Sequence, residues 1–186
     1  MKAFIISDSE FMTKTYENLN SRIKDYLAAK GFEAKEARIS RDTLAFCKGC
    51  FGCWVKSPGE CVISDEMAEL NHTAMTSDLV VYLCPVVFGQ YSANIKNAID
   101  RWLPNMLPFF IVRLDGSTMH PPRYESYPAQ AMIGYGDSLT NEDKQLFIDI
   151  IKKHRTNVEA FIYSDDMDLA QTLSGFELKR VEGKSL

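Results

Sequence analysis

The stretch Asp78-Leu79-Val80-Val81-Tyr82-Leu83-Cys84 is the most apolar run in this sequence. It shows no alternation of apolar and polar residues, which is typical of a strand buried on both faces. Pro85 follows at once and is expected to end the strand, because proline has no N–H to donate to a neighbouring strand. The run therefore predicts the central strand of a parallel sheet that is covered by helices on both sides.

The rest of the chain alternates between strand-like and helix-like segments. Further strands are predicted at residues 2–7, 33–39, 129–135 and 158–163, and helices at residues 16–30, 65–75, 92–103 and 141–154. Strands that alternate with helices favour a doubly wound α/β fold. We predict a flavodoxin-like parallel sheet of five strands in the order 2-1-3-4-5.

A single domain is predicted over residues 1–186, which is long enough to bury one core. Two segments interrupt the alternation. One is a cysteine-rich loop at residues 46–64, and the other is an irregular excursion at residues 104–128 that holds five of the seven prolines. Because the excursion is longer than an ordinary connection, it is expected to serve function or a partner contact.

The composition excludes several classes of protein. The net charge is −4, so no basic surface indicates a nucleic-acid partner. No apolar run approaches the roughly 20 residues of a membrane span, and no leader segment is recognisable at the start. We therefore expect a cytoplasmic protein without a membrane partner, in which clustered cysteines serve as metal ligands or redox groups.

Three loops follow predicted strands at the sheet edge where ligands of such folds bind. The first, residues 8–15, brings the hydroxyls of Ser9, Thr13 and Thr15 to the start of a helix, where a phosphate group could bind. The same loop carries Asp8 and Glu10, which would repel a phosphate. An anion site and an ordinary polar turn are therefore equally good interpretations of this loop.

The second loop is Pro85-Val86-Val87-Phe88-Gly89-Gln90-Tyr91-Ser92, an apolar segment with aromatic residues on both sides of a glycine. A flat ring ligand needs apolar contacts and a close backbone approach, which Gly89 allows. Aromatic loop residues are poor candidates for the core, so a ligand is favoured here. The third loop, Gly134-Tyr135-Gly136-Asp137, is a weaker candidate, either for closing over the same ring or for a simple turn.

Four of the five cysteines fall within fifteen residues, at Cys47, Cys50, Cys53 and Cys61, in the spacing C-x2-C-x2-C-x7-C. Three interpretations remain open. An iron–sulfur cluster would use all four thiolates. A zinc site also takes four ligands, but it usually joins two separated pairs. The third interpretation is a group of reduced thiols around a turn. The fifth cysteine, Cys84, is expected to lie buried in the central strand.

Together these residues resemble the NAD(P)H-dependent FMN reductases of flavodoxin-like fold, and among them the iron–sulfur flavoproteins. The most specific pieces are the cysteine spacing with Val62-Ile63-Ser64-Asp65-Glu66-Met67 after it, and the second loop with Lys96 and Asp100-Arg101 after it. Where the family usually carries Gly-Ser-Pro-Arg in the first loop, this chain has Asp8-Ser9-Glu10-Phe11.

The resemblance implies an FMN cofactor with its phosphate at Ser9, Thr13 and Thr15. It also implies a 4Fe–4S cluster at Cys47, Cys50, Cys53 and Cys61. The implied contacts of the flavin ring are Pro85, Val86, Val87, Phe88, Gly89, Tyr91, Gly134, Tyr135 and Gly136.

The implied activity is electron transfer from NAD(P)H to a small-molecule or protein acceptor, in part through the cluster. The nicotinamide is expected to stack near Tyr91 and Tyr135, and the resemblance implies a homodimer or homotetramer. The alternatives are a flavodoxin-like binding protein that has lost FMN, and a fold with a structural metal at the cysteines.

Overall fold

The computed structural model describes residues 1–154, 158–176 and 178–183. Its centre is a parallel sheet in the spatial order β2-β1-β3-β8-β9, which confirms the predicted order 2-1-3-4-5. The strands are β1 (Lys2–Asp8), β2 (Glu33–Ile39), β3 (Leu79–Val87), β8 (Ala129–Tyr135) and β9 (Val158–Ile162). β3 pairs with β1 on one side and with β8 on the other, so the apolar run is the central strand.

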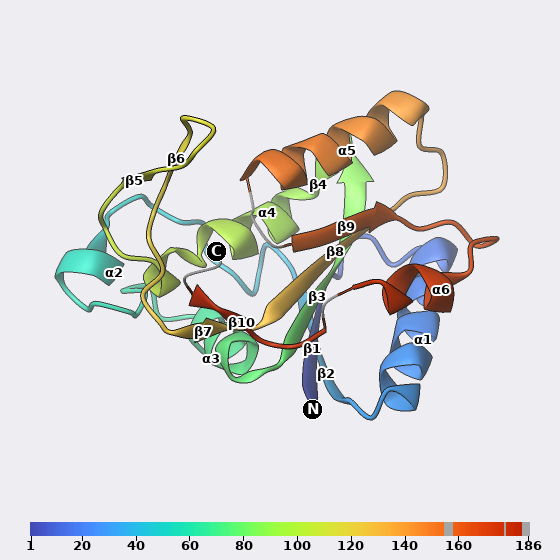
Figure 1. The fold of residues 1–186 in the computed structure, drawn as a ribbon, viewed down its shortest axis with the longest axis horizontal. Coiled ribbons are helices and arrows are strands. Elements are labelled where there is room, and N and C mark those ends of the chain that lie inside the picture. The colour runs from blue at the N-terminus through green and yellow to red at the C-terminus, as the bar shows by residue number, and fades with distance from the viewer. Residues whose placement is uncertain (155–157, 177, 184–186) are drawn as a thin grey trace.

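Helices cover both faces of this sheet, as Figure 1 shows. One face shares a core with α1 (Lys14–Ala29) and α6 (Leu169–Ser174). The other face shares a core with α3 (Met67–Thr76), α4 (Ala93–Asp100) and α5 (Asn141–His154). The predicted doubly wound α/β fold is therefore confirmed, because consecutive crossovers place helices on both sides of the strands.

The end of the central strand differs from the prediction. β3 does not stop before Pro85 but continues through it to Val87. The pairing of β1 with β3 ends at Leu83, so the missing N–H of Pro85 falls where β3 no longer has β1 as a neighbour. Pro85 still pairs with Tyr135 of β8, and a proline is tolerated in a strand where no neighbour needs its N–H. β3 then turns back into the short antiparallel strand β4 (Gln90–Tyr91).

The two segments that interrupt the alternation lie side by side, beyond the end of the sheet (Figure 1). The cysteine segment contains the short helix α2 (Gly52–Val55). The excursion contains η1 (Leu103–Asn105), the hairpin of β5 (Ile111–Val112) and β6 (Thr118–Met119), and β7 (Ser126–Tyr127), which pairs with β10 (Val181–Glu182). Trp54 of α2 contacts His120 beside β6, with ring centroids 4.7 Å apart.

Across the described ranges, no helix combines the length and the apolar character that crossing a membrane requires.

Edge strand β2 carries a carboxylate, that of Glu36, which accepts several hydrogen bonds. Glu36 accepts hydrogen bonds from Lys24 Nζ at 2.5 Å, Arg38 Nε at 3.1 Å and the Tyr16 hydroxyl at 2.9 Å. Partial burial alone would raise the pKa of Glu36. These hydrogen bonds outweigh the burial and lower the pKa to about 2.

We expect Glu36→Gln to remove an acid-sensitive part of the stability. Because the folded-state pKa lies below the ordinary value of 4.5, this contribution is complete above the ordinary value and is lost as pH falls toward the folded pKa. The shift corresponds to roughly 3 kcal/mol near neutral pH. Denaturant unfolding of both proteins should show a free-energy difference that shrinks between about pH 7 and about pH 3. A difference that stays constant with pH would contradict the assignment.

Candidate functional site

The carboxyl ends of β1, β3 and β8 lie next to one another, and side chains tie the three loops together. The hydroxyl of Thr15 donates to Asp137 Oδ1 at 2.6 Å, and the hydroxyl of Tyr135 donates to the carbonyl of Phe11 at 3.0 Å. Both bonds join the first loop to the third. The two loops that were predicted to surround one ligand are therefore held together in this structure.

A buried carboxylate joins the first loop to the second. Asp8 is fully buried and accepts hydrogen bonds from Ser92 Oγ at 2.5 Å, Asn94 Nδ2 at 3.0 Å and the Glu10 N–H at 2.9 Å. Ser92 caps α4 through its side chain. The Asp8 carboxylate thus points into the protein and fixes the start of α4, rather than facing the exposed side of the loop.

The predicted phosphate-binding hydroxyls all have partners within the chain. Ser9 Oγ donates to the carbonyl of Ile39 at 3.1 Å, and Thr15 donates to Asp137. Thr13 is the N-cap of α1 and accepts from the Tyr16 N–H, which leaves its own O–H available. As far as the described residues go, Thr13 is the one of the three hydroxyls that retains a donor for a ligand.

The start of α1 nevertheless offers the chemistry that a phosphate needs. The first N–H groups of a helix have no acceptor within the helix and carry the positive end of its dipole. Here these groups belong to Lys14 and Thr15, and the side chain of Lys14 is exposed beside them. The exposed carboxylates of Glu10 and Asp137 lie in the adjoining loops. The loop residues fit a phosphate at the helix start, with a local charge that is mixed rather than basic.

The second loop is a tight hairpin. Val86 pairs with Tyr91 across it, and the two residues at its tip, Phe88 and Gly89, have φ values of +49° and +72°. Positive φ at both central residues is the signature of a type I′ turn. Phe88 stands 89% exposed at the tip. A ring ligand at this edge would find Phe88 available without any rearrangement of the core.

Tyr91 corrects the prediction that the aromatic residues of this loop lie outside the core. Its side chain is 6% exposed and packs edge-on against Phe147 of α5, with ring centroids 6.2 Å apart. Tyr135 is 1% exposed, and this burial raises the pKa of its hydroxyl. Neither tyrosine ring therefore faces the surface, and the expectation that NAD(P)H stacks on the flavin near Tyr91 and Tyr135 stays a prediction.

Gly89→Ala should destabilise the hairpin for two reasons. A left-handed φ costs a non-glycine residue about 1–2 kcal/mol. A Cβ at this position would also lie 2.6 Å from Leu146 Cδ2 and 3.0 Å from Leu146 Cβ. Gly116 in the β5–β6 turn also has a positive φ, but nothing lies within 4 Å of its Cβ position. Gly116→Ala is therefore the matched control, and thermal unfolding should show the larger loss for Gly89→Ala; equal losses would argue against the contact with Leu146.

The four clustered cysteines line one small cavity, of about 20 Å³, which Arg101 also lines. Cys47 and Cys50 are exposed, Cys61 is half-buried and Cys53 is buried. Burial, together with the neighbouring Cys61, raises the pKa of the Cys53 thiol. Among the residues that the structure describes, no three metal-binding side chains lie close enough together to hold an ion. Cys84 is fully buried in β3, as predicted.

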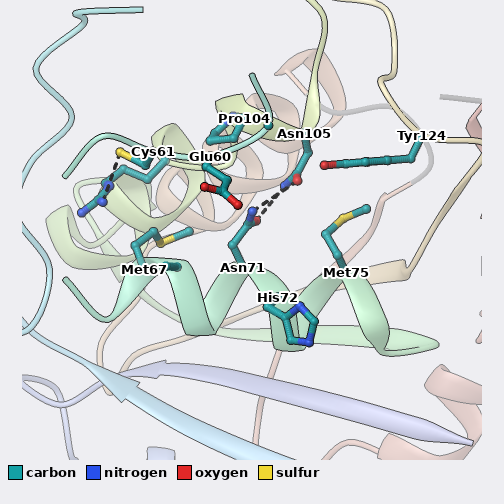
Figure 2. Close-up of a pocket in the computed structure, with 12 residues that line it drawn as sticks. Glu60, Cys61, Met67, Asn71, His72, Met75, Pro104, Asn105 and Tyr124 are labelled. Atoms are coloured by element: carbon teal, nitrogen blue, oxygen red, sulfur yellow. Dashed lines mark hydrogen bonds between the residues drawn. The ribbon is translucent and has the colours of Figure 1, made fainter. Parts of the chain in front are cut away.

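A second, larger cavity of about 360 Å³ lies between α3, the end of the cysteine segment and η1 (Figure 2). Asn71 of α3 and Asn105 of η1 exchange two hydrogen bonds, of 2.7 and 3.3 Å, across its wall. Cys61 and Arg101 line both cavities. No sequence pattern predicted this cavity, because its wall is assembled from segments far apart in the chain.

Comparisons with known proteins agree with this architecture. Residues 1–109 match the family of NADPH-dependent FMN reductases. An iron–sulfur flavoprotein of Archaeoglobus fulgidus is 38% identical over 86 residues, which cover 46% of this chain and 38% of that protein. This chain spans about half the length, or less, of the curated relatives it matches.

Solved structures show the same fold over nearly the whole chain. An NAD(P)H:quinone oxidoreductase from Methanothermobacter marburgensis superposes with a TM-score of 0.64 at 11% identity, covering 91% of this chain and 87% of that one. An FMN-dependent NADH-azoreductase from Bacillus anthracis, solved in complex with FMN, gives a TM-score of 0.55 at 11% identity, covering 93% and 92% of the two chains.

The sheet order defines a flavodoxin-like α/β protein, and the three loops at the carboxyl edge of its strands are joined by hydrogen bonds. This edge is where folds of this kind bind their ligands. The family match extends over more than half of the chain. This protein belongs to the NADPH-dependent FMN reductase family.

Proposed function

We propose that this protein is an FMN-dependent oxidoreductase that takes electrons from NAD(P)H and passes them to a small-molecule or protein acceptor. The observation that carries the proposal is the joining of the three loops at the carboxyl edge, in a chain of the FMN reductase family. Bound FMN would supply hydride acceptance and release of electrons singly or in pairs.

The chain's own residues would then bind and orient the cofactor. The start of α1, with Thr13 and the exposed Lys14, would hold the phosphate. The hairpin tip at Phe88 and Gly89 would contact the ring. Gly136 follows β8 directly and would border the ring from the third loop, whereas Gly134 lies inside β8.

Lys14→Glu is the sharpest test of the phosphate position. FMN added to the purified protein should lose its fluorescence on binding, and the variant should bind about tenfold or more weakly, because a cation beside the phosphate becomes an anion. Lys30 lies just beyond the other end of α1, so Lys30→Glu makes the same charge change away from the site and should bind like the wild type. If the wild type binds no FMN, the alternative of a binding protein that has lost FMN replaces the proposal.

The four thiols are proposed to hold a 4Fe–4S cluster that relays electrons to the acceptor. The donor set supports this, because four thiols line one cavity and an arginine N–H lies against one sulfur. The curated relatives are themselves named iron–sulfur flavoproteins. Metal analysis of protein prepared without oxygen separates the interpretations: iron with inorganic sulfide supports the cluster, zinc indicates a structural site, and no metal indicates reduced thiols.

A homodimer or homotetramer is proposed as the working form. The β5–β6 hairpin and the residues before it expose Phe109, Phe110 and Val112 by 63%, 69% and 74%. Apolar side chains grouped in this way mark surfaces that bind other proteins. Sedimentation equilibrium should give two or four chains per particle, and Phe110→Lys should shift it toward the monomer. A wild type that remains monomeric would refute this assembly.

A further inference from the structure

Among the residues that the structure describes, Arg101 is the most deeply buried charged residue that the proposed flavin site does not use. It follows the end of α4, and its side chain is 0% exposed. In the structure Asp100 pairs with Lys96 at the surface, whereas Arg101 turns inward and pairs with Asp65 through both nitrogens of its fork.

Two further hydrogen bonds of the Arg101 side chain lie on either side of the clustered cysteines. Its Nη1 donates to the carbonyl of Ala45 at 2.9 Å, and its Nη2 donates to Cys61 Sγ at 3.3 Å. Ala45 precedes the first clustered cysteine, and Cys61 is the last one. Asp65 itself accepts from the Ala45 N–H at 3.0 Å. One buried pair therefore holds both ends of the segment that carries the four thiols.

α4 makes a second attachment to the same segment. Asn97 lies one turn before Arg101, and its amide donates to the carbonyls of Leu44 and Ala45 at 3.2 Å each. Its Oδ1 accepts from the Cys47 N–H at 3.4 Å. The buried polar face of α4 thus fixes the backbone at the start of the cysteine segment, while Arg101 reaches the sulfur of Cys61 near its end.

The thiols themselves divide into held and unheld groups. Cys53 is buried, and Cys61 is fixed by Arg101. Cys47 and Cys50 are exposed, and the cavity between the four is too small for a cluster as it stands. Because no three metal-binding side chains lie close enough to hold an ion among the described residues, binding a metal centre requires these thiols to move closer together. Within the described residues, Arg101 Nε has no acceptor, which leaves one further N–H on this guanidinium.

We propose that Arg101 is the positioning residue of the four-cysteine centre: its clasp with Asp65 and Ala45 holds Cys61 where it completes a four-thiolate site. The inference deepens the proposed function and rests on its assignment of the cysteines as metal ligands. Arginine suits this role because its planar fork makes several hydrogen bonds in fixed directions, which lysine cannot do. Hydrogen-bond partners of metal ligands typically contribute about 10–100-fold to metal affinity.

The test is a Cd²⁺ titration of the reduced, metal-free protein without oxygen, followed by thiolate-to-metal charge-transfer absorbance. The wild type should bind Cd²⁺ with the absorbance of four thiolates. Arg101→Gln should show three, with affinity lower by about tenfold or more. Lys96→Gln removes an exposed cation from the same helix and should match the wild type. Full four-thiolate absorbance and affinity in Arg101→Gln would overturn the proposal, and so would fewer than four thiolates in the wild type.

Two further variants separate positioning from charge and from folding. Arg101→Lys keeps the charge and loses the fork, so it should also show three thiolates; complete rescue would refute the positioning role. Arg101→Gln combined with Asp65→Asn leaves no buried carboxylate without its cation, and near-ultraviolet circular dichroism checks its fold. A folded double variant with wild-type Cd²⁺ binding would likewise overturn the proposal. FMN binding, measured on the same samples, should be unchanged, so failure of the flavin assignment is seen separately.

Discussion

Asp8→Ala is expected to lower both the stability and the FMN affinity of this protein. The substitution leaves the buried donors of Ser92 and Asn94, and the part-buried N–H of Glu10, without their acceptor. Each buried unsatisfied group costs about 1–3 kcal/mol, and since the Ser92 hydroxyl can turn to another acceptor, we expect a total near 3 kcal/mol. For a chain of this size that lowers Tm by roughly 6–12 °C.

The effect on FMN follows from what Asp8 connects. The carboxylate ties the first loop to the cap of α4, which directly follows the ring-binding hairpin. Without it the two loops lose their common anchor, and FMN should bind about tenfold more weakly. Asp8→Asn keeps one acceptor oxygen and should lie between the wild type and Asp8→Ala in thermal unfolding and in FMN titration. Tighter FMN binding by either variant would show instead that the charge of Asp8 opposes the phosphate.

Gly134→Val is expected to be the most destabilising of the glycine substitutions considered. A Cβ at Gly134 would lie 2.6 Å from Ile162 Cδ1 and 2.9 Å from both Phe147 Cε1 and Val86 Cγ2. These atoms come from β9, α5 and β3, so no single side chain can move aside to make room. Overpacking of this kind costs about 1–3 kcal/mol, and the added methyl groups of valine place the result at the upper end.

Gly175→Ala is the matched control for Gly134→Val. Gly175 ends α6 with a negative φ, and nothing lies within 4 Å of its Cβ position. Alanine there should leave Tm unchanged or raise it slightly, because it restricts the unfolded chain. Gly134→Ala should lie between the two in denaturant unfolding. A tolerated Gly134→Val would show that the three surrounding elements can separate, and that Gly134 is kept for a ligand rather than for packing.

The order of the elements could be predicted because it depends on local patterns. The run at residues 78–84 could only be a strand buried on both faces, and helical periodicity on either side of it required crossovers. The ends of the helices and strands were predicted less accurately. Whether a strand continues through Pro85 depends on whether a neighbour needs its N–H, and that is decided by the pairing of β1 with β3.

The sequence predicted which loops form the candidate site, but not which contacts their side chains make. Asp8 looked like an exposed loop acid, yet it is the last residue of β1 and lies buried against α4. Its place at the end of a strand run was the available signal. Tyr91 and Tyr135 were predicted as contacts of a ring ligand, and the structure shows that both side chains are packed in the core. An aromatic side chain beside a glycine is the same sequence signal in both settings, and packing partners distant in the chain select between them.

By itself, the sequence determined that the chain forms a doubly wound parallel sheet and that four thiols cluster between its second strand and the helix that follows, since both are properties of neighbouring residues. Only the tertiary structure decided which polar groups are buried. Asp8 with Asn94, and Arg101 with Cys61, are 86 and 40 residues apart, and a buried charge is held wherever the fold brings it a partner. The central run at residues 78–84 therefore determines the sheet, and these long-range contacts position the side chains of the candidate site.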